Sequence, residues 1–261
     1  MKRSILFSLV FLLISACGPS QKSPDAKPNL TDVPVNVPPA ATDAISSEVP
    51  SPSPSPEPTA TTETERIIFQ DNFLGFLDEN WQWLNEDPAN WSLEAVPGSL
   101  QITIENGFLN LKNASNVLLQ TAPEGNFQLE TSLNFPKNNR THFAGLLLYE
   151  SENNFIQAGH AYCNPVNRCV GDGIYLEEYN QGIVLTDPYV AQKYDQDSVY
   201  LRLIYRDGLL VFLVSPDGSA WYRISASPVN FDILQVGLVA SQNLKDPSPV
   251  TFDYFQIKAL K

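Results

Sequence analysis

Ten residues, HAYCNPVNRC from His160 to Cys169, hold one of the two histidines of the chain and two of its three cysteines. Imidazole and thiolate groups bind zinc, and two nearby cysteines can also form a redox pair or a disulfide. A zinc site would need a fourth ligand and reduced thiols, and a Cys-x5-Cys spacing is not that of a zinc knuckle. The compartment in which the chain resides decides between these chemistries, and the N-terminus bears on that compartment.

Residues 1–17 have the organisation of an export signal. Lys2 and Arg3 precede an apolar stretch from Ile5 to Ile14, which is shorter than the roughly 20 residues of a transmembrane helix. The Ile-Ser-Ala-Cys ending resembles the bacterial lipobox. That resemblance implies cleavage before Cys17, lipidation of Cys17, and anchoring to the extracytoplasmic face of a bacterial membrane, at the cell surface or in the periplasm. The alternative is an ordinary secretory signal with an incidental cysteine.

Residues 18–65 are rich in Pro, Ser, Thr, Ala and acidic residues, include SPSPSPEP, and contain no aromatic residue. Such a segment cannot bury enough apolar surface to fold, so we expect a disordered linker. With Cys17 assigned to the lipid, Cys163 and Cys169 remain as an even pair in an oxidising compartment. We therefore predict a disulfide between them, closing a loop that turns at Asn164-Pro165.

Residues 66–261 contain all four Trp and all ten Tyr, and their apolar residues recur with a period of two. FQLETSLNF from Phe127 to Phe135 shows the alternation well, and Asp207-Gly208 and Asp217-Gly218 supply hairpin turns. The pattern predicts an all-β domain of two stacked antiparallel sheets, a sandwich or jelly roll. Strands are expected near 67–70, 91–94, 100–104, 108–111, 117–121, 127–135, 143–149, 155–163, 173–179, 199–205, 209–214, 221–225, 234–240 and 250–258.

The charge of this domain argues against binding to nucleic acid. Four of the 16 basic and seven of the 29 acidic residues precede residue 66, which leaves 12 basic and 22 acidic residues in the domain. Phosphate backbones require clustered Lys and Arg. We therefore exclude nucleic acid as a partner.

Several motifs of the domain occur in a recognisable order. They are FQDNF (69–73), WQWLNEDPANWSL (81–93), PGSLQI (97–102), LLQTAP (118–123), AGLLLY (144–149) and FDYFQI (252–257). Together they resemble a bacterial family of concanavalin A-like sandwiches, similar to the non-catalytic C-terminal sandwich of family 43 glycoside hydrolases. The resemblance implies this fold and an extracellular, carbohydrate-related role, but it brings no active site.

Catalytic patterns are scarce in the domain. A glycosidase needs two carboxylates on one side of a cleft, whereas neighbours such as Glu177 and Glu178 face opposite ways in a strand. Glu150 and Glu152 have the right parity but flank a predicted turn, and no Gly-x-Ser-x-Gly elbow exists for a nucleophilic serine. We expect a non-catalytic domain, with a glycosidase as the less favoured alternative.

A structural calcium ion is the one cofactor that the sequence suggests. Asp71 and Asn72 near the first strand could meet Asp253 in the last, because the terminal strands of such sandwiches often pair. No Asp-x-Asp-x-Asp-Gly loop is present. Asp71 and Asp253 are therefore weak calcium candidates, and no other cofactor is expected.

Aromatic residues that alternate with polar residues are the best binding candidates, because sugars present apolar C–H faces and hydroxyl groups. Trp81, Trp83 and Trp91 are assigned mainly to the core, since Trp91 shares parity with Leu93. If the remaining candidates share one sheet, they form one ligand-binding face. They are His160, Tyr162, Tyr175, Glu177, Tyr179, Tyr200, Arg202, Trp221 and Arg223.

These observations favour a lipid-anchored protein that binds a glycan or cell-surface polysaccharide through one sandwich domain. On this interpretation the disulfide holds His160 and Tyr162 at the rim of the binding face. A protein-interaction or scaffold domain is the alternative from another class. Such a face suits a sugar or a protein partner. The alternative for the candidate residues themselves is that they are ordinary residues of a solvent-facing sheet, with arginine stems covering aromatic rings.

Overall fold

A computed structural model of the chain describes residues 65–136, 142–163, 169–242 and 247–261. The predicted signal, the lipidation site Cys17, the linker up to residue 64 and the Asn164-Pro165 turn lie outside these residues and stay predictions. In the described part of the chain, no helix is both long enough and apolar enough to cross a membrane.

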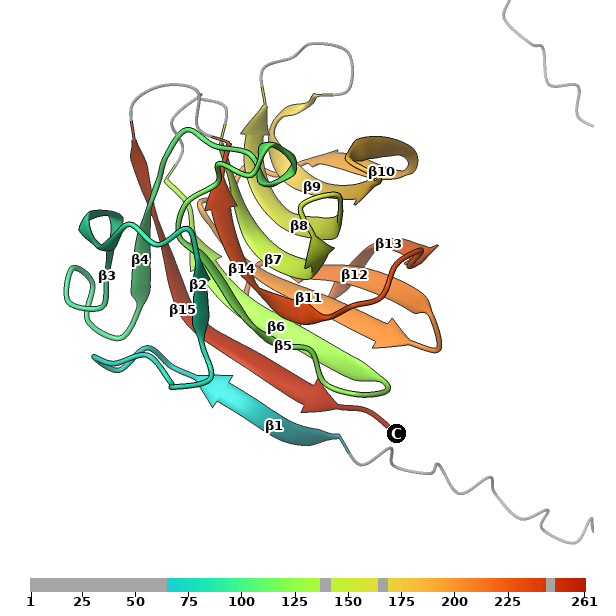
Figure 1. The fold of residues 1–261 in the computed structure, drawn as a ribbon, viewed down its shortest axis with the longest axis horizontal. Coiled ribbons are helices and arrows are strands. Elements are labelled where there is room, and N and C mark those ends of the chain that lie inside the picture. The colour runs from blue at the N-terminus through green and yellow to red at the C-terminus, as the bar shows by residue number, and fades with distance from the viewer. Residues whose placement is uncertain (1–64, 137–141, 164–168, 243–246) are drawn as a thin grey trace, which may run out of the picture. The chain divides into compact units, whose positions relative to one another are not determined.

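Two antiparallel sheets stack face to face in the described domain, which confirms the predicted sandwich (Figure 1). Sheet A has eight strands: β1 (Arg66–Asp71), β3 (Trp91–Ser92), β4 (Leu100–Ile104), β6 (Phe127–Asn134), β11 (Ser198–Arg206), β12 (Leu209–Ser215), β13 (Tyr222–Pro228) and β15 (Ser248–Ala259). Sheet B has seven: β2 (Gln82–Leu84), β5 (Val117–Thr121), β7 (His142–Ser151), β8 (Asn154–Cys163), β9 (Gly171–Asn180), β10 (Ile183–Lys193) and β14 (Gln235–Ser241).

The core between the sheets follows from the two-residue alternation of the sequence. In β6, Phe127, Leu129 and Leu133 belong to the main buried cluster, and Leu146 and Ile156 join it from sheet B. Burying one large apolar side chain contributes about 1.5–3 kcal/mol, so this double layer supplies most of the folding energy. The prediction that tryptophan packs in the core is also confirmed. Trp81 is buried, and Trp83 and Trp91 pack against the same cluster.

The outer face of sheet B carries a second buried cluster. It includes Phe143 and Leu147 of β7, Phe155 of β8 and Tyr175 of β9. Leu109, in the short 3-10 helix η2 (Leu109–Leu111), packs onto the same cluster from the segment before β5. Strands β7 and β8 are therefore buried on both faces, which explains why AGLLLY shows no alternation.

Two glycines lie opposite each other at the centre of this outer face. Gly145 of β7 pairs with Gly159 of β8. A Cβ on Gly159 would lie 2.1 Å from the carbonyl oxygen of Ala144, and one on Gly145 would lie 2.3 Å from that of Ala158. Only glycine allows the two backbones to approach this closely, and Figure 1 shows strong curvature in β7, β8 and β9.

Three local predictions differ from the structure. The strand expected at 108–111 is wrong: the Asn113 side chain accepts a hydrogen bond from the Phe108 backbone at 2.9 Å and closes the segment into η2. Strands β2 and β10 were not predicted. The first has three residues, and the second is a partly exposed edge strand that contains Pro188. Neither strand shows the alternation that marks a half-buried strand.

Candidate ligand-binding face

The predicted binding residues do not share one face. Strands β8 and β9 belong to sheet B, whereas β11 and β13 belong to sheet A, so the assumption of a shared sheet is wrong. The nine residues divide into three groups: His160 and Tyr162 on the inner side of sheet B; Tyr175, Glu177 and Tyr179 on its outer side; and Tyr200, Arg202, Trp221 and Arg223 on the outer side of sheet A.

His160 lies between the sheets and not at the rim of a binding face. It is fully buried, its Nε2 is 2.8 Å from Oδ1 of Asp172, and its ring packs against Phe135 and Tyr194. Tyr162 follows on the same side of β8, where it pairs with His142. The expectation that both residues border an open face is therefore wrong for His160, which is buried, whereas Tyr162 is partly exposed near the end of β8.

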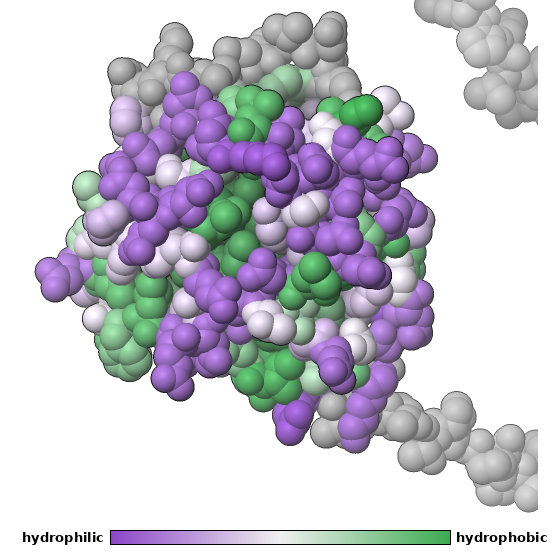
Figure 2. Space-filling model, in the orientation of Figure 1, coloured by the Kyte–Doolittle hydropathy of each residue, from purple (hydrophilic) through white to green (hydrophobic). Residues whose placement is uncertain are grey.

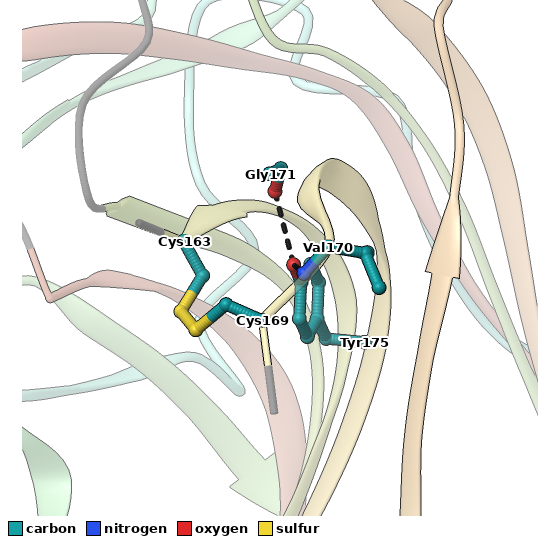
Figure 3. Close-up of a disulfide and its surroundings, with 5 residues drawn as sticks. All are labelled: Cys163, Cys169, Val170, Gly171 and Tyr175. Atoms are coloured by element: carbon teal, nitrogen blue, oxygen red, sulfur yellow. Dashed lines mark hydrogen bonds between the residues drawn. A yellow bond between two sulfur atoms is a disulfide. The ribbon is translucent and has the colours of Figure 1, made fainter. Parts of the chain in front are cut away.

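The predicted disulfide is confirmed. Cys163 ends β8 and Cys169 lies just before β9, with a Cα–Cα distance of 5.4 Å (Figure 3). Beside it, the Tyr175 hydroxyl donates to the Gly171 carbonyl at 2.9 Å and accepts from the Val170 backbone N–H at 2.9 Å. Tyr175 is 2% exposed, so its ring secures this corner and leaves little surface for a ligand.

The outer face of sheet A holds a closed polar network. Arg202 donates from Nε to Oε2 of Glu130 at 2.7 Å, and its guanidinium lies 3.6 Å from the centre of the Trp221 ring. Tyr254 donates to the other oxygen of Glu130 at 2.8 Å, and burial raises the pKa of Tyr254 above its ordinary value. An arginine stacked on an aromatic ring and paired with a carboxylate is a stabilising surface arrangement, as the alternative interpretation held.

On the outer face of sheet B, three aromatic residues lie in register across neighbouring strands. Tyr149 of β7 pairs with Phe155 of β8, which pairs with Tyr179 of β9. The rings of Phe155 and Tyr179 are stacked, with centroids 4.5 Å apart and planes 15° apart. Phe155 is buried, and Tyr179 packs against the same cluster but stays partly exposed, so part of Tyr179 remains accessible beside the stack.

The next row of this face is polar. Gln157 pairs with Glu177 between β8 and β9, and its Nε2 donates to Oε2 of Glu177 at 2.7 Å. Gln157 is 1% exposed, which fixes the orientation of the more exposed Glu177 carboxylate. A hydroxyl-rich ligand on the aromatic row would thus find a fixed acceptor beside it.

A pocket of about 160 Å³ opens at the Tyr149 end of the row. Leu84, Leu109 and Tyr149 supply apolar surface, and an ion pair between Lys112 and Glu152 borders it. Lys112 lowers the pKa of Glu152, while burial and the Glu152 charge raise the pKa of Tyr149, which keeps the phenol protonated. Figure 2 shows an apolar recess between hydrophilic side chains on this side of the domain.

The carboxylates of β9 point to opposite sides of the sheet. Glu177 lies outside with Gln157, whereas Glu178 is fully buried between the sheets and accepts a hydrogen bond from Asn230 Nδ2 at 3.1 Å. Burial raises the pKa of Glu178 above its ordinary value of 4.5. These two acids cannot act together on one glycosidic bond.

The two calcium candidates bind protein donors. Asp71 accepts hydrogen bonds from the Phe73 and Asp78 backbones and from Trp81 Nε1, and Asp253 accepts from Ser99 and Ser132. Among the residues that the structure describes, no group of three or more His, Cys, Asp or Glu side chains could hold a metal ion. The calcium prediction therefore gains no support at this pair and stays untested.

The sequence profile of one family spans most of the domain. Residues 70–258 match the family described as "Beta xylosidase C-terminal Concanavalin A-like domain", GH43_C2. The chain belongs to this family. The resemblance inferred from the motifs is thereby confirmed, and the GH43_C2 match corresponds to the C-terminal, non-catalytic part of GH43 enzymes.

Solved structures with the same fold include longer GH43 proteins. The GH43 BlXynB protein from Bacillus licheniformis is 20% identical with a TM-score of 0.64, covering 72% of this chain and 38% of its own. A xylan beta-1,4-xylosidase from Bacillus halodurans is 19% identical with a TM-score of 0.61, covering 73% of this chain and 39% of its own. The chain thus corresponds to about two fifths of the length of these relatives.

A smaller protein of similar fold is matched over almost its whole length. The CBM2 module of the evolved Dit protein from Lactobacillus casei BL23 phage J-1 is 10% identical with a TM-score of 0.54, covering 76% of this chain and 97% of its own. Curated protein sequences gave no match. At these identities the structural likeness establishes the fold alone.

Sequence reasoning missed several residues of the outer face in this GH43_C2 domain. Tyr149 shares parity with Phe143 and Leu147, so the two-residue spacing alone could have placed it on the same side of β7 as these residues. Lys112 and Glu152 carry no such signal, because they approach each other from two separate turns. Their proximity depends on how the segment before β5 crosses sheet B.

Glu178 gives this domain a predictable pH dependence. Because its folded-state pKa is raised, the stability it contributes is complete below pH 4.5 and is lost as the pH rises through the raised value. We expect Glu178→Gln, which mimics the protonated acid, to melt at a higher temperature than the wild type at neutral pH and at an equal temperature in acid. Thermal melts at both pH values test this, and an equal or lower melting temperature at neutral pH would contradict it.

Proposed function

We propose that the domain is a non-catalytic carbohydrate-binding module that holds a glycan on the outer face of sheet B. The observation that carries the proposal is the aromatic row of Tyr149, Phe155 and Tyr179, in register on three strands and ending at a pocket. The Tyr179 ring can stack on the apolar face of a sugar, because its orientation is fixed by the buried Phe155 ring.

Polar groups flank the row where sugar hydroxyls would lie. Glu177, oriented by Gln157, can accept hydrogen bonds from sugar hydroxyl groups on one side of the row. Lys112 and Glu152 offer a donor and an acceptor at the pocket. The names of its longer relatives, such as xylan beta-1,4-xylosidase, refer to glycans and support a carbohydrate ligand for this chain.

We also propose that this domain has no glycosidase activity. Its family is a C-terminal accessory domain, and the adjacent acids Glu177 and Glu178 lie on opposite sides of a sheet. Binding requires only stacking and hydrogen bonds on a preformed surface, both of which the outer face offers.

We also infer that the domain is attached to an extracytoplasmic membrane face through lipidated Cys17 and the linker of residues 18–65. The sequence of the export signal supports this placement. A tethered module would hold its sites at a high effective concentration near the membrane. Labelled palmitate incorporated by the wild type and not by Cys17→Ser would support it, and equal labelling would contradict it.

Substituting Tyr179 tests the binding face directly. After a glycan array identifies a ligand for the full chain, we expect Tyr179→Ala to weaken binding about tenfold, because the stacking surface is lost. Isothermal titration calorimetry measures the change. The matched control is Trp221→Ala on the outer face of sheet A, which should keep wild-type affinity. Failure of every polysaccharide to bind, or equal losses in the two variants, would refute the proposal.

A further inference from the structure

A larger and more polar pocket lies at one edge of the sandwich, where β1 of sheet A faces β5 and β2 of sheet B. Its volume is about 390 Å³, which falls within the roughly 300–1,000 Å³ of small-molecule sites. Its lining residues are Ile68, Phe69, Glu79, Asn80, Gln82, Gln120, Thr121, Pro123 and Ile257. None of them belongs to the aromatic row or to the Tyr149 pocket.

The lining combines an apolar wall with amide groups. Phe69 and the buried Ile257 pair with each other across β1 and β15, and Ile68 is 39% exposed beside them. Asn80 and Gln82 are exposed and offer both donors and acceptors. The carboxylate of Glu79 can accept hydrogen bonds from hydroxyl groups, and it repels acidic ligands.

Gln120 is the residue that points to a ligand. It lines the pocket, is only 5% exposed, and its Nε2 has no hydrogen-bond partner among the described residues. Leaving a buried amide donor unpaired costs about 1–3 kcal/mol. If Gln120 had only a structural role, an apolar side chain at this position would therefore be more stable. This donor has almost no accessible surface, so the Gln120 side chain must turn into the pocket before a ligand oxygen can satisfy it.

The apolar wall is held rigidly. The Phe69 ring meets Trp81 edge to face, with centroids 5.4 Å apart, and Trp81 meets Phe255 at 5.0 Å. Asp71 fixes the indole by accepting from Trp81 Nε1 at 2.8 Å. A preorganised wall lowers the entropy cost of binding a ring against it.

We propose that this edge pocket is a binding site for an uncharged saccharide, separate from the outer face of sheet B. The C–H face of one sugar ring packs on Phe69 and Ile68. Its hydroxyl groups bond to Asn80 and Gln120, whose Nε2 then gains its acceptor. Glu79 disfavours uronic acids at the same site.

Side-chain amide signals in ¹H–¹⁵N NMR spectra of the full chain test the site. The probes are xylobiose and cellobiose. We expect the Gln120 and Asn80 side-chain signals to shift saturably. Their assignment comes from Gln120→Leu and Asn80→Ala, and Asn80→Ala should weaken binding at the Gln120 signal about fivefold.

Tyr179→Ala is the control that separates the two sites. We expect it to leave the saturation curve of the Gln120 signal unchanged. Static Gln120 and Asn80 signals, an unchanged curve in Asn80→Ala, or loss of the Gln120 shift in Tyr179→Ala would each overturn the edge pocket. A shift of the Gln120 side-chain signal without a shift of the Tyr179 backbone amide signal would instead support the edge pocket and refute the proposed function of the outer face.

Discussion

Replacing Gly159 with alanine is expected to lower the free energy of unfolding by about 3 kcal/mol. The new Cβ would lie 2.1 Å from the Ala144 carbonyl oxygen and 2.7 Å from the Cα of Gly145. Both atoms belong to the backbone of the paired strand β7, so no side-chain rotation can relieve the overlap. Overpacking of this kind costs roughly 1–3 kcal/mol, and the upper end applies because two central strands must separate.

Urea unfolding followed by circular dichroism measures the Gly159→Ala effect. The control is Gly125→Ala, where the added Cβ meets nothing within 4 Å but φ is +74°. Its expected cost is only about 1 kcal/mol, from the left-handed backbone alone. If Gly159→Ala were no more destabilising than this control, the close approach of β7 and β8 would not be essential to the fold.

Replacing Asp71 with alanine is expected to destabilise the domain by a similar amount, about 3 kcal/mol. One carboxylate serves three donors: the Phe73 N–H at 2.8 Å, the Asp78 N–H at 3.1 Å and Trp81 Nε1 at 2.8 Å. Removing it leaves a buried indole N–H and two backbone N–H groups without their acceptor. Each hydrogen bond to a charged group contributes roughly 1.5–3 kcal/mol, and partial access to water reduces the total.

Asp253→Ala provides the comparison for Asp71. Asp253 is exposed, and among the described residues it accepts from the hydroxyl groups of Ser99 and Ser132, which can turn to water. We therefore expect it to cost about 1 kcal/mol or less. Differential scanning calorimetry of both variants with and without EDTA completes the test. Equal losses of stability in Asp71→Ala and Asp253→Ala would contradict the argument that Asp71 stabilises the domain through its three donors. A lower wild-type melting temperature in EDTA would favour a calcium site instead.

The fold could be predicted because alternate burial leaves a direct trace in the sequence. In β6 and β11, every second residue enters the core, and both strands were expected within two residues of their observed bounds. The same reasoning fails at β10, an edge strand that buries little, and at η2, where one asparagine side chain turns the chain. Short-range hydrogen bonds override periodicity when few side chains are buried.

The candidate site was harder to predict because parity assigns a residue to a side of its own strand and not to a sheet. Tyr175 and Arg202 both alternate with apolar residues, but β11 pairs with β6 in sheet A while β9 pairs with β8 in sheet B. Which sheet a strand joins depends on long crossovers. Parity also cannot distinguish the inner from the outer side when both are apolar, which is why His160 was placed on the wrong side.

Strand β15 occupies the middle of sheet A, although it is the last strand of the domain to be synthesised. It pairs with β6 on one side and with β4 and β1 on the other. Until residues 248–259 have left the ribosome, β1 has no partner in this sheet and β6 exposes an open edge. The central pairing of sheet A therefore forms only after the last strand of the domain has emerged, and its long-range contacts are of the kind that slows folding.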